Sequence, residues 1–401
     1  MKGNSFVPFM KRKGDGSTLN LDFTGGSLDS RVVLTRSAAT ATYINSSGYV
    51  ATAAANEARF DYDPTTLAAK GLLIEGSAIN LLKYSVYADT NWLTAGGYTK
   101  SYTTGITSPA NDSTAAKVTF STTGQGLYTS ASTMNYTNSV GSVYTWSAWI
   151  RATANTTNLN IRFGDSAVGL GSNIAISTTW TRYSYSYTAV SNSGPHLNSA
   201  SGTATGEFEM WGFQLEIGSA ASSYIPTTTA QATRNPDLAL MTSTNFSSWF
   251  SGGTTGTFFV DWYGGVRGIA LTVRSVISTS DVPTKHLHLQ QVSAAGALKV
   301  ADSLAAHSVS TANSITSGAR TKGAFNFDGA TSTVNLCLNG GTVATSSAIA
   351  FSVAPTWLVL GATSTDGTSL TDVNTVLNGS IRQIKYYPTA LTSAQLIAMS
   401  T

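Results

Sequence analysis

Apolar and polar residues alternate with a period of two along most of this chain. In residues 144–151, YTWSAWIR, the even-numbered positions carry Tyr, Trp, Ala and Ile, and the odd-numbered positions carry Thr, Ser, Trp and Arg. In residues 181–188, TRYSYSYT, three tyrosines fall on one side and Arg182 on the other. Successive side chains of a β-strand point to opposite faces, so this period indicates strands; helical periodicity is nearly absent. The pattern predicts an all-β protein.

Turn-forming residues divide the strands and suggest the limits of domains. Clusters of Gly, Ser and Asn at short intervals favour sandwich or jelly-roll architecture. A Thr-rich stretch with Asn235-Pro236 is typical of a linker, and the strand pattern restarts after it. We expect an N-terminal arm and a small β region followed by two β-sandwich domains. The limits are 1–15 for the arm, 16–79 for the small β region, 80–228 for the first sandwich, 229–245 for the linker and 246–401 for the second sandwich.

Three local signals predict individual elements. Residues 71–75, GLLIE, indicate a short buried strand, and Asn339-Gly340-Gly341 fits a hairpin turn. Near the end of the chain a strand is expected to run to Tyr387, where Pro388 stops it. A short helix is expected to follow, with Thr392 or Ser393 as its N-cap.

Composition and charge exclude several classes of function. Charged residues make up only 11% of the chain and the net charge is +3, with no basic stripe of the kind that binds nucleic acid. The one dense basic cluster, residues 11–13, is expected to be a solvated arm. Cys337 is the only cysteine, so no intramolecular disulfide is possible. No signal peptide and no apolar run of about 20 residues is present, which predicts synthesis in a cytoplasm and no membrane insertion.

Several motifs of this chain resemble those of a widespread family of tailed-bacteriophage structural proteins. They are TRSAATATYINSSGYV, ARFDYDP, GLLIE and NLLKYS near the N-terminus, WGFQLEIGS, SYIPT and TRNPD across 211–237, and FFVDWYG, VNLCLNG and LNGSIRQIKYYPTALTSAQL in the last third. The resemblance implies a jelly roll similar to a carbohydrate-binding module, then a laminin-G/concanavalin-A-like sandwich. One departure is Ala78-Ile79, where the family usually has Arg-Thr. This weakens any transfer of a polar role to that place.

Two glutamates at strand spacing are the strongest indication of an enzyme. Glu207 and Glu209 share one face of a predicted strand, and retaining glycosidases use two carboxyl groups about 5–5.5 Å apart. The glucanase motif Glu-x-Asp-x-(x)-Glu has an Asp in the middle, where this chain has Trp211. We therefore expect ordinary acids at the edge of a sheet and no enzymatic activity. Glu216 is expected to cap a turn or to accept backbone N–H groups.

Candidate metal ligands do not form a complete set. His286 and His288 lie two apart on a predicted strand, but no third ligand is near them. Asp328-Gly329 and Asp366-Gly367 fall in predicted loops, which in laminin-G-like folds sometimes hold calcium. A single Asp beside Gly supplies few of the six or more oxygens that calcium requires, so a turn is favoured. We expect no metal and no cofactor.

Aromatic side chains are the remaining candidates for a binding site. Flat rings with a few polar groups are typical of sugar recognition. The predicted glycan-binding residues are Trp149, Arg151, Tyr183, Tyr185 and Tyr187. For the three tyrosines, a place in the core or in a subunit contact is the favoured alternative. Four other aromatic residues are expected in the core: Trp146, Trp211, Phe213 and Trp262.

Together these features predict a bacteriophage virion structural protein, a tail-fibre or adhesin subunit that attaches to host-surface glycans. Its N-terminal region would dock to other virion proteins, and weak glycan contacts would add up in an oligomer. A homotrimer is implied by family habit alone. Two alternatives stay open: a capsid, neck or fibre-anchoring protein with protein contacts only, and a polysaccharide-depolymerising tailspike.

Overall fold

The structure is a computed structural model that describes most of the chain. The described residues are 14–37, 40–86, 93–95, 101–120, 126–128, 136–154, 160–165, 169–170, 174–192, 194–199, 206–250, 253–264, 268–274, 286–292, 297–301, 308–316, 318–347, 356–362 and 376–401. Residues 11–13 of the predicted arm lie outside them.

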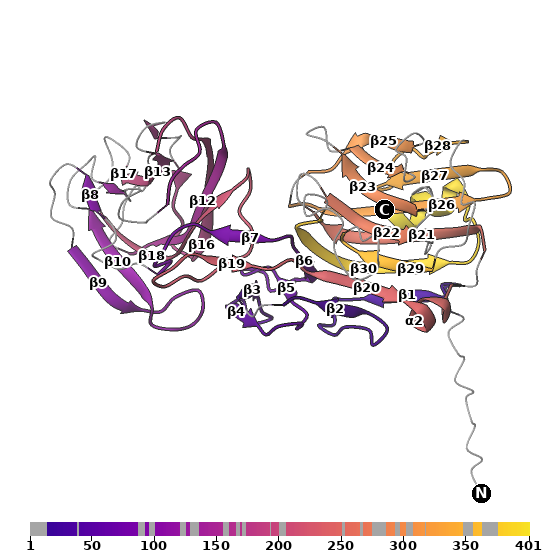
Figure 1. Cartoon of the computed structure of the whole chain (residues 1–401), viewed down its shortest axis with the longest axis horizontal. Coiled ribbons are helices and arrows are strands. Elements are labelled where there is room, and N and C mark those ends of the chain that lie inside the picture. The colour runs from indigo at the N-terminus through magenta and orange to yellow at the C-terminus, as the bar shows by residue number, and fades with distance from the viewer. Residues whose placement is uncertain are drawn as a thin grey trace, which may run out of the picture. The chain divides into compact units, whose positions relative to one another are not determined.

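The fold is all-β, as the alternating pattern predicts, and it forms two compact units (Figure 1). One unit comprises residues 34–238, and the other combines residues 1–33 with residues 239–401. The chain passes from one unit to the other in β2 (Val33–Thr35) and in β20 (Leu238–Thr242).

The larger sheet of unit 34–238 has the strand order β16-β12-β18-β10-β9, and all its pairs are antiparallel. Its strands are β9 (Ser101–Ile106), β10 (Ala115–Phe120), β12 (Val143–Ala152), β16 (Thr181–Thr188) and β18 (Gly206–Ile217). The central pair, β12 and β18, is almost wholly buried because this sheet is covered on both faces.

A second sheet completes the jelly roll. It has the order β14-β13-β17-β11-β8, with β15 paired to β13. Its strands are β8 (Leu93–Ala95), β11 (Gly126–Tyr128), β13 (Asn160–Asp165), β14 (Gly169–Leu170), β15 (Ile174–Ala175) and β17 (Pro195–Ser199). Leu127 and Leu197 of this sheet share one core cluster with Trp146 and Phe213 of the larger sheet. The two sheets therefore enclose a common core. All four aromatic residues expected in a core are confirmed as buried: Trp146, Trp211, Phe213 and Trp262.

Short strands from near the start and the end of the unit cover the other face of the larger sheet. These are β3 (Ala41–Ile44), β4 (Val50–Ala53), β5 (Phe60–Tyr62), β6 (Ala69–Ile74), β7 (Ala78–Asn80) and β19 (Ala232–Arg234). They form three antiparallel pairs, β3 with β4, β5 with β6, and β7 with β19. The segment GLLIE is the buried strand that its sequence predicts.

Two predicted domain limits differ from the structure. Residues 16–79 are not one region, because β1 (Leu19–Asp22) pairs with β30 (Gly379–Tyr387) in the other unit. Residues 229–245 are not a free linker, because they contain β19 and all of β20 and because Arg234 and Asp237 are buried. The two predicted limits followed the order of segments along the sequence. The observed limits follow from the pairing of strands and from the burial of Arg234 and Asp237.

The strands of residues 1–33 and 239–401 belong to two antiparallel sheets. In one, β28-β27-β26-β21-β30 are neighbours in that order and β1 pairs with β30; in the other the order is β20-β29-β22-β23-β24-β25. The remaining strands are β21 (Thr255–Tyr263), β22 (Gly268–Arg274), β23 (His286–Val292), β24 (Ala297–Ala301), β25 (Ser308–Ser314), β26 (Arg320–Asp328), β27 (Thr333–Leu338), β28 (Ala344–Ser346) and β29 (Trp357–Leu360). Phe246 of helix α2 (Ser243–Ser247) packs against Trp249, and Trp249 packs against Phe258 and Tyr386.

The local predictions for this unit are confirmed. Strand β30 ends at Tyr387, and the turn at residues 339–341 joins β27 to β28. Helix α3 (Ser393–Ser400) begins after Thr392, whose side chain accepts a hydrogen bond from the backbone of Gln395 while the Gln395 side chain accepts one from the Thr392 backbone. None of the described helices is long and apolar enough to cross a membrane.

Candidate functional site

A pocket of about 390 Å³ lies within unit 34–238, between the short strands β3–β6 and the larger sheet. Its lining combines aromatic rings, charged groups and hydroxyls. The residues that matter for its chemistry are Tyr43, Asp61, Lys70, Glu75, Trp149, Trp180, Arg182, Ser222, Ser223 and Tyr224.

Aromatic rings make one wall of the pocket. Trp149 packs edge-on against Trp211 and Tyr224, with ring centroids 5.3 Å and 5.6 Å away. Trp149 fits there because β18 bulges at Gly212, which has a φ of +70° and whose hydrogens face the indole ring. Trp180 is only partly buried, and the guanidinium of Arg151 lies 4.7 Å over its ring. The wall therefore has a rigid part and a more exposed part.

Arg182 provides a positive charge in this wall. Its guanidinium lies 4.6 Å over the Trp149 ring and donates to the Ser222 carbonyl at 2.6 Å and to the Ser147 hydroxyl at 2.9 Å. Its Nε is shielded from solvent and has no hydrogen-bond acceptor. Burial lowers the pKa of Arg182, and the more distant charge of Glu216 only partly opposes this shift.

Asp61 and Lys70 lie on the neighbouring strands β5 and β6. The Asp61 carboxylate accepts a hydrogen bond from the Ile44 backbone at 2.9 Å, and Lys70 Nζ is 4.0 Å from its other oxygen. Burial raises the pKa of Asp61 to about 6, since the hydrogen bond from Ile44 and the charge of Lys70 do not outweigh it.

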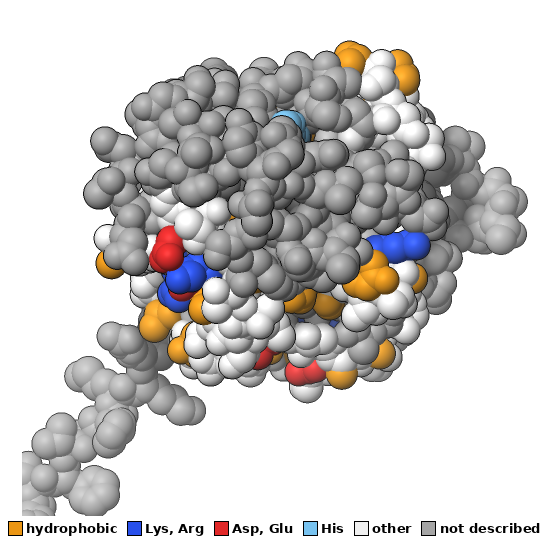
Figure 2. Space-filling model, turned by 90° about the vertical axis from the view of Figure 1, so that its left-hand side faces the viewer, with side chains coloured by type: hydrophobic (Ala, Val, Ile, Leu, Met, Phe, Trp, Pro, Cys, Tyr) orange, Lys and Arg blue, Asp and Glu red, His pale blue; other side chains and the backbone are white. Residues whose placement is uncertain are grey.

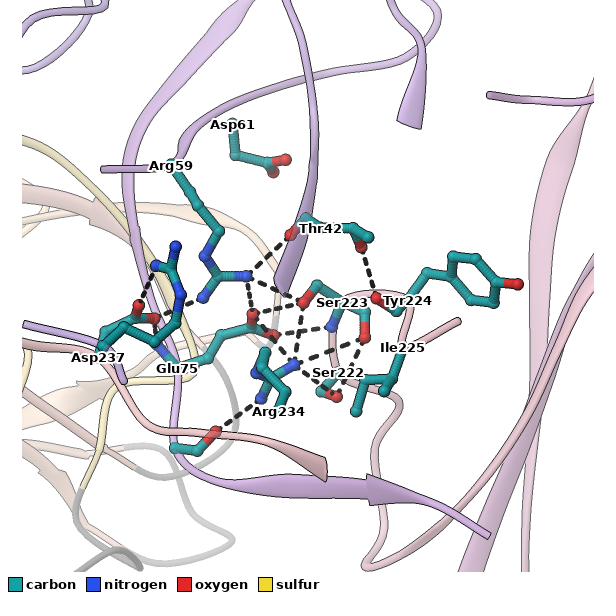
Figure 3. A network of polar contacts seen from close by, with 12 residues as sticks. Thr42, Arg59, Asp61, Glu75, Ser222, Ser223, Tyr224, Ile225, Arg234 and Asp237 are labelled. Atoms are coloured by element: carbon teal, nitrogen blue, oxygen red, sulfur yellow. Dashed lines mark hydrogen bonds and ion pairs between the residues drawn. The ribbon is translucent and has the colours of Figure 1, made fainter. Parts of the chain in front are cut away.

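Below these groups lies a buried network of ion pairs (Figure 3). Glu75 accepts from Arg59 at 2.6 Å, from the Ser223 backbone at 2.7 Å and from the Ser223 hydroxyl at 2.7 Å, and Arg234 lies 3.2 Å from it. Burial by itself would raise the pKa of Glu75, but the charges of Arg234 and Arg59 outweigh it and lower the pKa to about 2. Glu75 is therefore ionised at every physiological pH.

Asp237 extends the network through ion pairs with two arginines. It pairs with Arg59 and, at 2.8 Å, with Arg36, while its carboxylate also accepts the backbone N–H of Glu75 at 2.9 Å. Arg36 donates in addition to the carbonyls of Ala54 and Glu57. All these side chains are at least 95% buried. The network ties strands from both ends of the unit together.

The network accounts for the family-like motifs of the sequence. Arg36 belongs to TRSAAT, Arg59 to ARFDYDP, Glu75 to GLLIE, and Arg234 with Asp237 to TRNPD. In the sequence these motifs support the resemblance, but nothing in it shows that their charged side chains form ion pairs with one another. The available signal was that each of these motifs carries charged residues, although charged residues make up only 11% of the chain.

The five predicted glycan-binding residues lie on two opposite faces of the larger sheet. Tyr187 is in the core of the jelly roll, and Tyr183 and Tyr185 pack against that core. Trp149 is on the other face, in the pocket wall. Arg151 shares its face and pairs with Glu209. The structure thus does not bring the five together in one platform, and it places the tyrosines as the core alternative expects.

The glutamates of β18 each have a basic or hydroxyl partner. Glu207 lies 3.2 Å from Lys117 Nζ, and Glu209 pairs with Arg151. Glu216 is buried and accepts the backbone N–H of Ser222 at 3.0 Å, which confirms its expected role in holding a turn. Asp328 likewise accepts the backbone N–H of Ala330 at 3.0 Å, as a turn residue does.

No group of three or more potential metal ligands occurs among the described residues. The side chains of His286 and His288 and the whole of Asp366-Gly367 lie outside the described part, so those expectations stay predictions. On the face drawn in Figure 2, the described charged side chains form small separate groups and no continuous basic surface.

We expect Asp61→Asn to change how stability depends on pH. The folded state holds the Asp61 proton more tightly than the unfolded chain does, because the pKa rises from 3.8 to about 6. Its contribution to the free energy of unfolding therefore falls as the pH rises from about 4 to about 6, and stays low above that. Asn still accepts from Ile44 without a charge, so the variant should be about 1–3 kcal/mol more stable than the parent at pH 7 and about equal to it at pH 4.

Urea unfolding of parent and variant at several pH values between 4 and 7, followed in unit 34–238 by hydrogen exchange, measures this difference. Asp63→Asn is the matched control of opposite sign, because hydrogen bonds from the backbone of Thr66 and Thr65 lower the pKa of Asp63. That variant should lose stability at pH 7. A parent and an Asp61→Asn variant that differ equally at every pH would contradict the prediction.

Comparison with known proteins gives only weak similarities. No protein family and no curated protein matches this chain. The CBM40 domain of the Ruminococcus gnavus IT-sialidase, solved with α2,3-sialyllactose, is 18% identical with a TM-score of 0.30, over 37% of this chain and 82% of that one. The CBM22-1 xylan-binding domain of Paenibacillus barcinonensis Xyn10C is 15% identical with a TM-score of 0.29, over 37% and 99%. The heptameric SAP-like pentraxin of Limulus polyphemus is 15% identical with a TM-score of 0.30, over 37% and 71%. These similarities assign no family, ligand or activity to the chain.

Proposed function

We propose that this chain is a glycan-binding structural subunit of a bacteriophage particle, of tail-fibre or adhesin type, that attaches the particle to host-surface glycans. The observation that supports glycan binding is the pocket of about 390 Å³ in unit 34–238. Binding sites for small ligands are typically concave and combine apolar surface with oriented polar groups. This pocket combines aromatic rings with charged groups and hydroxyls.

The pocket supplies what a sugar ring needs. The ring of Trp180 is partly exposed and offers an apolar surface to the C–H groups of a pyranose. Asp61, Lys70 and Arg182 offer acceptors and donors for hydroxyl groups. The buried network beneath holds Ser222 and Ser223 in place, so the pocket is formed before a ligand enters.

The place in a virion is supported by the motifs of the sequence. They resemble phage structural proteins, and the buried network gives those motifs a physical role in holding the unit together. In the proposed mechanism the N-terminal region docks to other virion proteins and an oligomer, which we take to be a trimer, presents several pockets at once. Several weak sites then give strong attachment. Immunogold labelling of intact particles with an antibody against this chain tests the location.

We also propose that the chain binds without cleaving. Glu209 is paired with Arg151 and Glu207 lies beside Lys117. A retaining glycosidase needs two carboxyl groups that face the bond to be cleaved, whereas each of these carboxylates faces a basic side chain of a neighbouring strand. Incubation with host polysaccharide and analysis of its chain length tests this point, because a depolymerase would shorten the polymer.

We expect Trp180→Ala to weaken glycan binding about 5- to 30-fold. A ring stacked on a sugar contributes about 1–2 kcal/mol through buried apolar surface. The measurement is affinity for surface polysaccharides on an array, followed by calorimetry with each polysaccharide that binds. The control is Tyr49→Ala, which removes an exposed ring of the same unit that does not line the pocket. Equal affinities of the Trp180→Ala variant and the parent would contradict a role for the pocket.

A further inference from the structure

We propose that the pocket selects acidic sugars, and that Arg182 together with Lys70 binds the carboxylate of a uronic-acid or sialic-acid residue. This inference rests on the proposed glycan binding and names the class of sugar. It is carried by the charge arrangement around the pocket, and above all by an arginine that has no acidic partner.

Arg182 differs from the other arginines of the pocket region. Arg59 and Arg234 each have a carboxylate within hydrogen-bonding or ion-pairing distance. Among the residues that the structure describes, no carboxylate oxygen lies within 4.0 Å of the Arg182 guanidinium. Its contacts are a carbonyl, a hydroxyl and the face of Trp149, and its Nε has no acceptor. A shielded cation without a counter-charge is unfavourable, and an anionic ligand would provide that counter-charge.

The acids near the pocket are already engaged. Glu75 is shared by Arg59 and Arg234, and Glu216 accepts from Ser222 and Gln214. Asp61 is the acid closest to being free, but it accepts the Ile44 backbone N–H and has Lys70 beside it. Among the residues that line the pocket, Lys70 and Arg182 are basic and Asp61 and Glu75 are acidic, and both of these acids already have basic partners.

Lys70 supplies the second charge from the opposite side of the pocket. Its side chain is 29% exposed, and its one ion pair among the described residues, with Asp61, is at 4.0 Å, which is too long for a hydrogen bond. Arginine and lysine on two sides of a pocket suit a carboxylate, because the ion can accept charge-assisted hydrogen bonds from both. The partly exposed ring of Trp180 at the same pocket offers a surface for the sugar ring that carries this carboxylate. A neutral hexose would leave the Arg182 guanidinium without a counter-charge.

The test compares sugars that differ only in the carboxylate. The first pair is a trigalacturonate and the same trimer with its C6 carboxylates reduced to alcohols; the second is sialyllactose and its C1 amide. Calorimetry with the full chain should show at least one acid bound about 10- to 100-fold more tightly than its neutral partner. Raising the salt concentration should narrow that difference, because screening weakens the ion pair.

Two variants test whether Arg182 and Lys70 cause the preference for acidic sugars. Arg182→Gln should bring the acid down to the affinity of the neutral sugar. Because this change also removes contacts to Ser222 and Ser147, Lys70→Met serves as a second variant that leaves the core untouched, and it should reduce the acid preference about 5- to 10-fold. Lys117→Met, which removes a cation of the same unit outside the pocket lining, should leave both affinities unchanged.

The outcomes separate this inference from the proposed function. If neutral sugars bind as well as acids and Trp180→Ala weakens both, glycan binding stands and selection of acids is overturned. An acid preference that survives both Arg182→Gln and Lys70→Met also overturns the assignment. If no sugar of either kind binds the parent chain, on these pairs or on the polysaccharide array, both proposals fail together.

Discussion

Glu75→Gln should cost unit 34–238 about 3–5 kcal/mol of unfolding free energy, the largest effect expected from a single substitution in this protein. Gln has nearly the shape of Glu and still accepts the backbone N–H of Ser223. What it lacks is the negative charge that compensates Arg59 and Arg234, both of which are fully shielded from water. The variant leaves three buried cations of the network, Arg36, Arg59 and Arg234, with Asp237 as the one remaining carboxylate among the residues that pair with them.

The loss should depend on pH in a defined way. Because the pKa of Glu75 is lowered from 4.5 to about 2, its ionised form stabilises the fold above about pH 4.5, and this stabilisation disappears as the pH falls toward 2. A protonated Glu75 carries no charge and resembles Gln. The difference between parent and variant should therefore be full at pH 7 and should shrink below pH 4.5.

The measurement has to distinguish the two compact units, since a chain of two units has no single unfolding free energy. Hydrogen exchange read by mass spectrometry reports on each, and peptides from β21 serve as an internal reference for the other unit. The matched control is Glu207→Gln, which removes a partly exposed ion pair with Lys117 and should cost less than about 1 kcal/mol. Equal losses for the two variants would contradict the claim that burial of the network makes Glu75 important.

Gly212→Ala should destabilise the same unit by about 2–5 kcal/mol and displace Trp149 from the pocket wall. Gly212 has a φ of +70°, which a residue with a side chain adopts only at a cost. A Cβ at this position would lie 2.7 Å from Cε3 of Trp149. The indole cannot move away freely because Trp211, Tyr224 and Arg182 surround it.

Gly105→Ala is the control that separates the cost of a positive φ from the cost of a steric clash with Trp149. Gly105 has a similar φ of +79°, but no atom lies within 4 Å of the Cβ that would be added. This control should cost only the backbone term of about 1–2 kcal/mol. Faster hydrogen exchange in β12 and β18, together with weaker glycan binding, is expected for Gly212→Ala alone. If the two variants behave alike, the bulge does not position Trp149.

Much of the fold could be predicted because it depends on neighbouring residues. The alternation in 144–151 and 181–188 correctly assigned strands and sorted their side chains into two sets. The helix after Thr392 follows from a local N-cap signal, which the structure shows as a capping box between Thr392 and Gln395. Domain limits were less predictable: β1 pairs with β30 across more than three hundred residues, and no local signal in residues 16–33 reveals that partner.

The candidate site was predicted only in part. Trp149 was expected to bind, and it lines the pocket. Tyr183, Tyr185 and Tyr187 look equally suitable in sequence, because an aromatic stripe has the same spacing whether it faces a ligand or a core. Asp61, Lys70 and Arg182 were not expected at the site, since the first two come from strands that the sequence assigns to a different region.

The sequence alone determined the all-β class, the core positions Trp146, Trp211 and Phe213, and the division of each strand's side chains into two opposite sets. These features depend on the two-residue repeat of side-chain direction along a β-strand, and this repeat is present within each single strand. Only the tertiary structure decided which side is covered by the second sheet and which borders a pocket, and which distant charges become partners. Arg36 and Asp237 are 201 residues apart and share a hydrogen bond. Such pairings result from the packing of the whole unit, and no single segment encodes them.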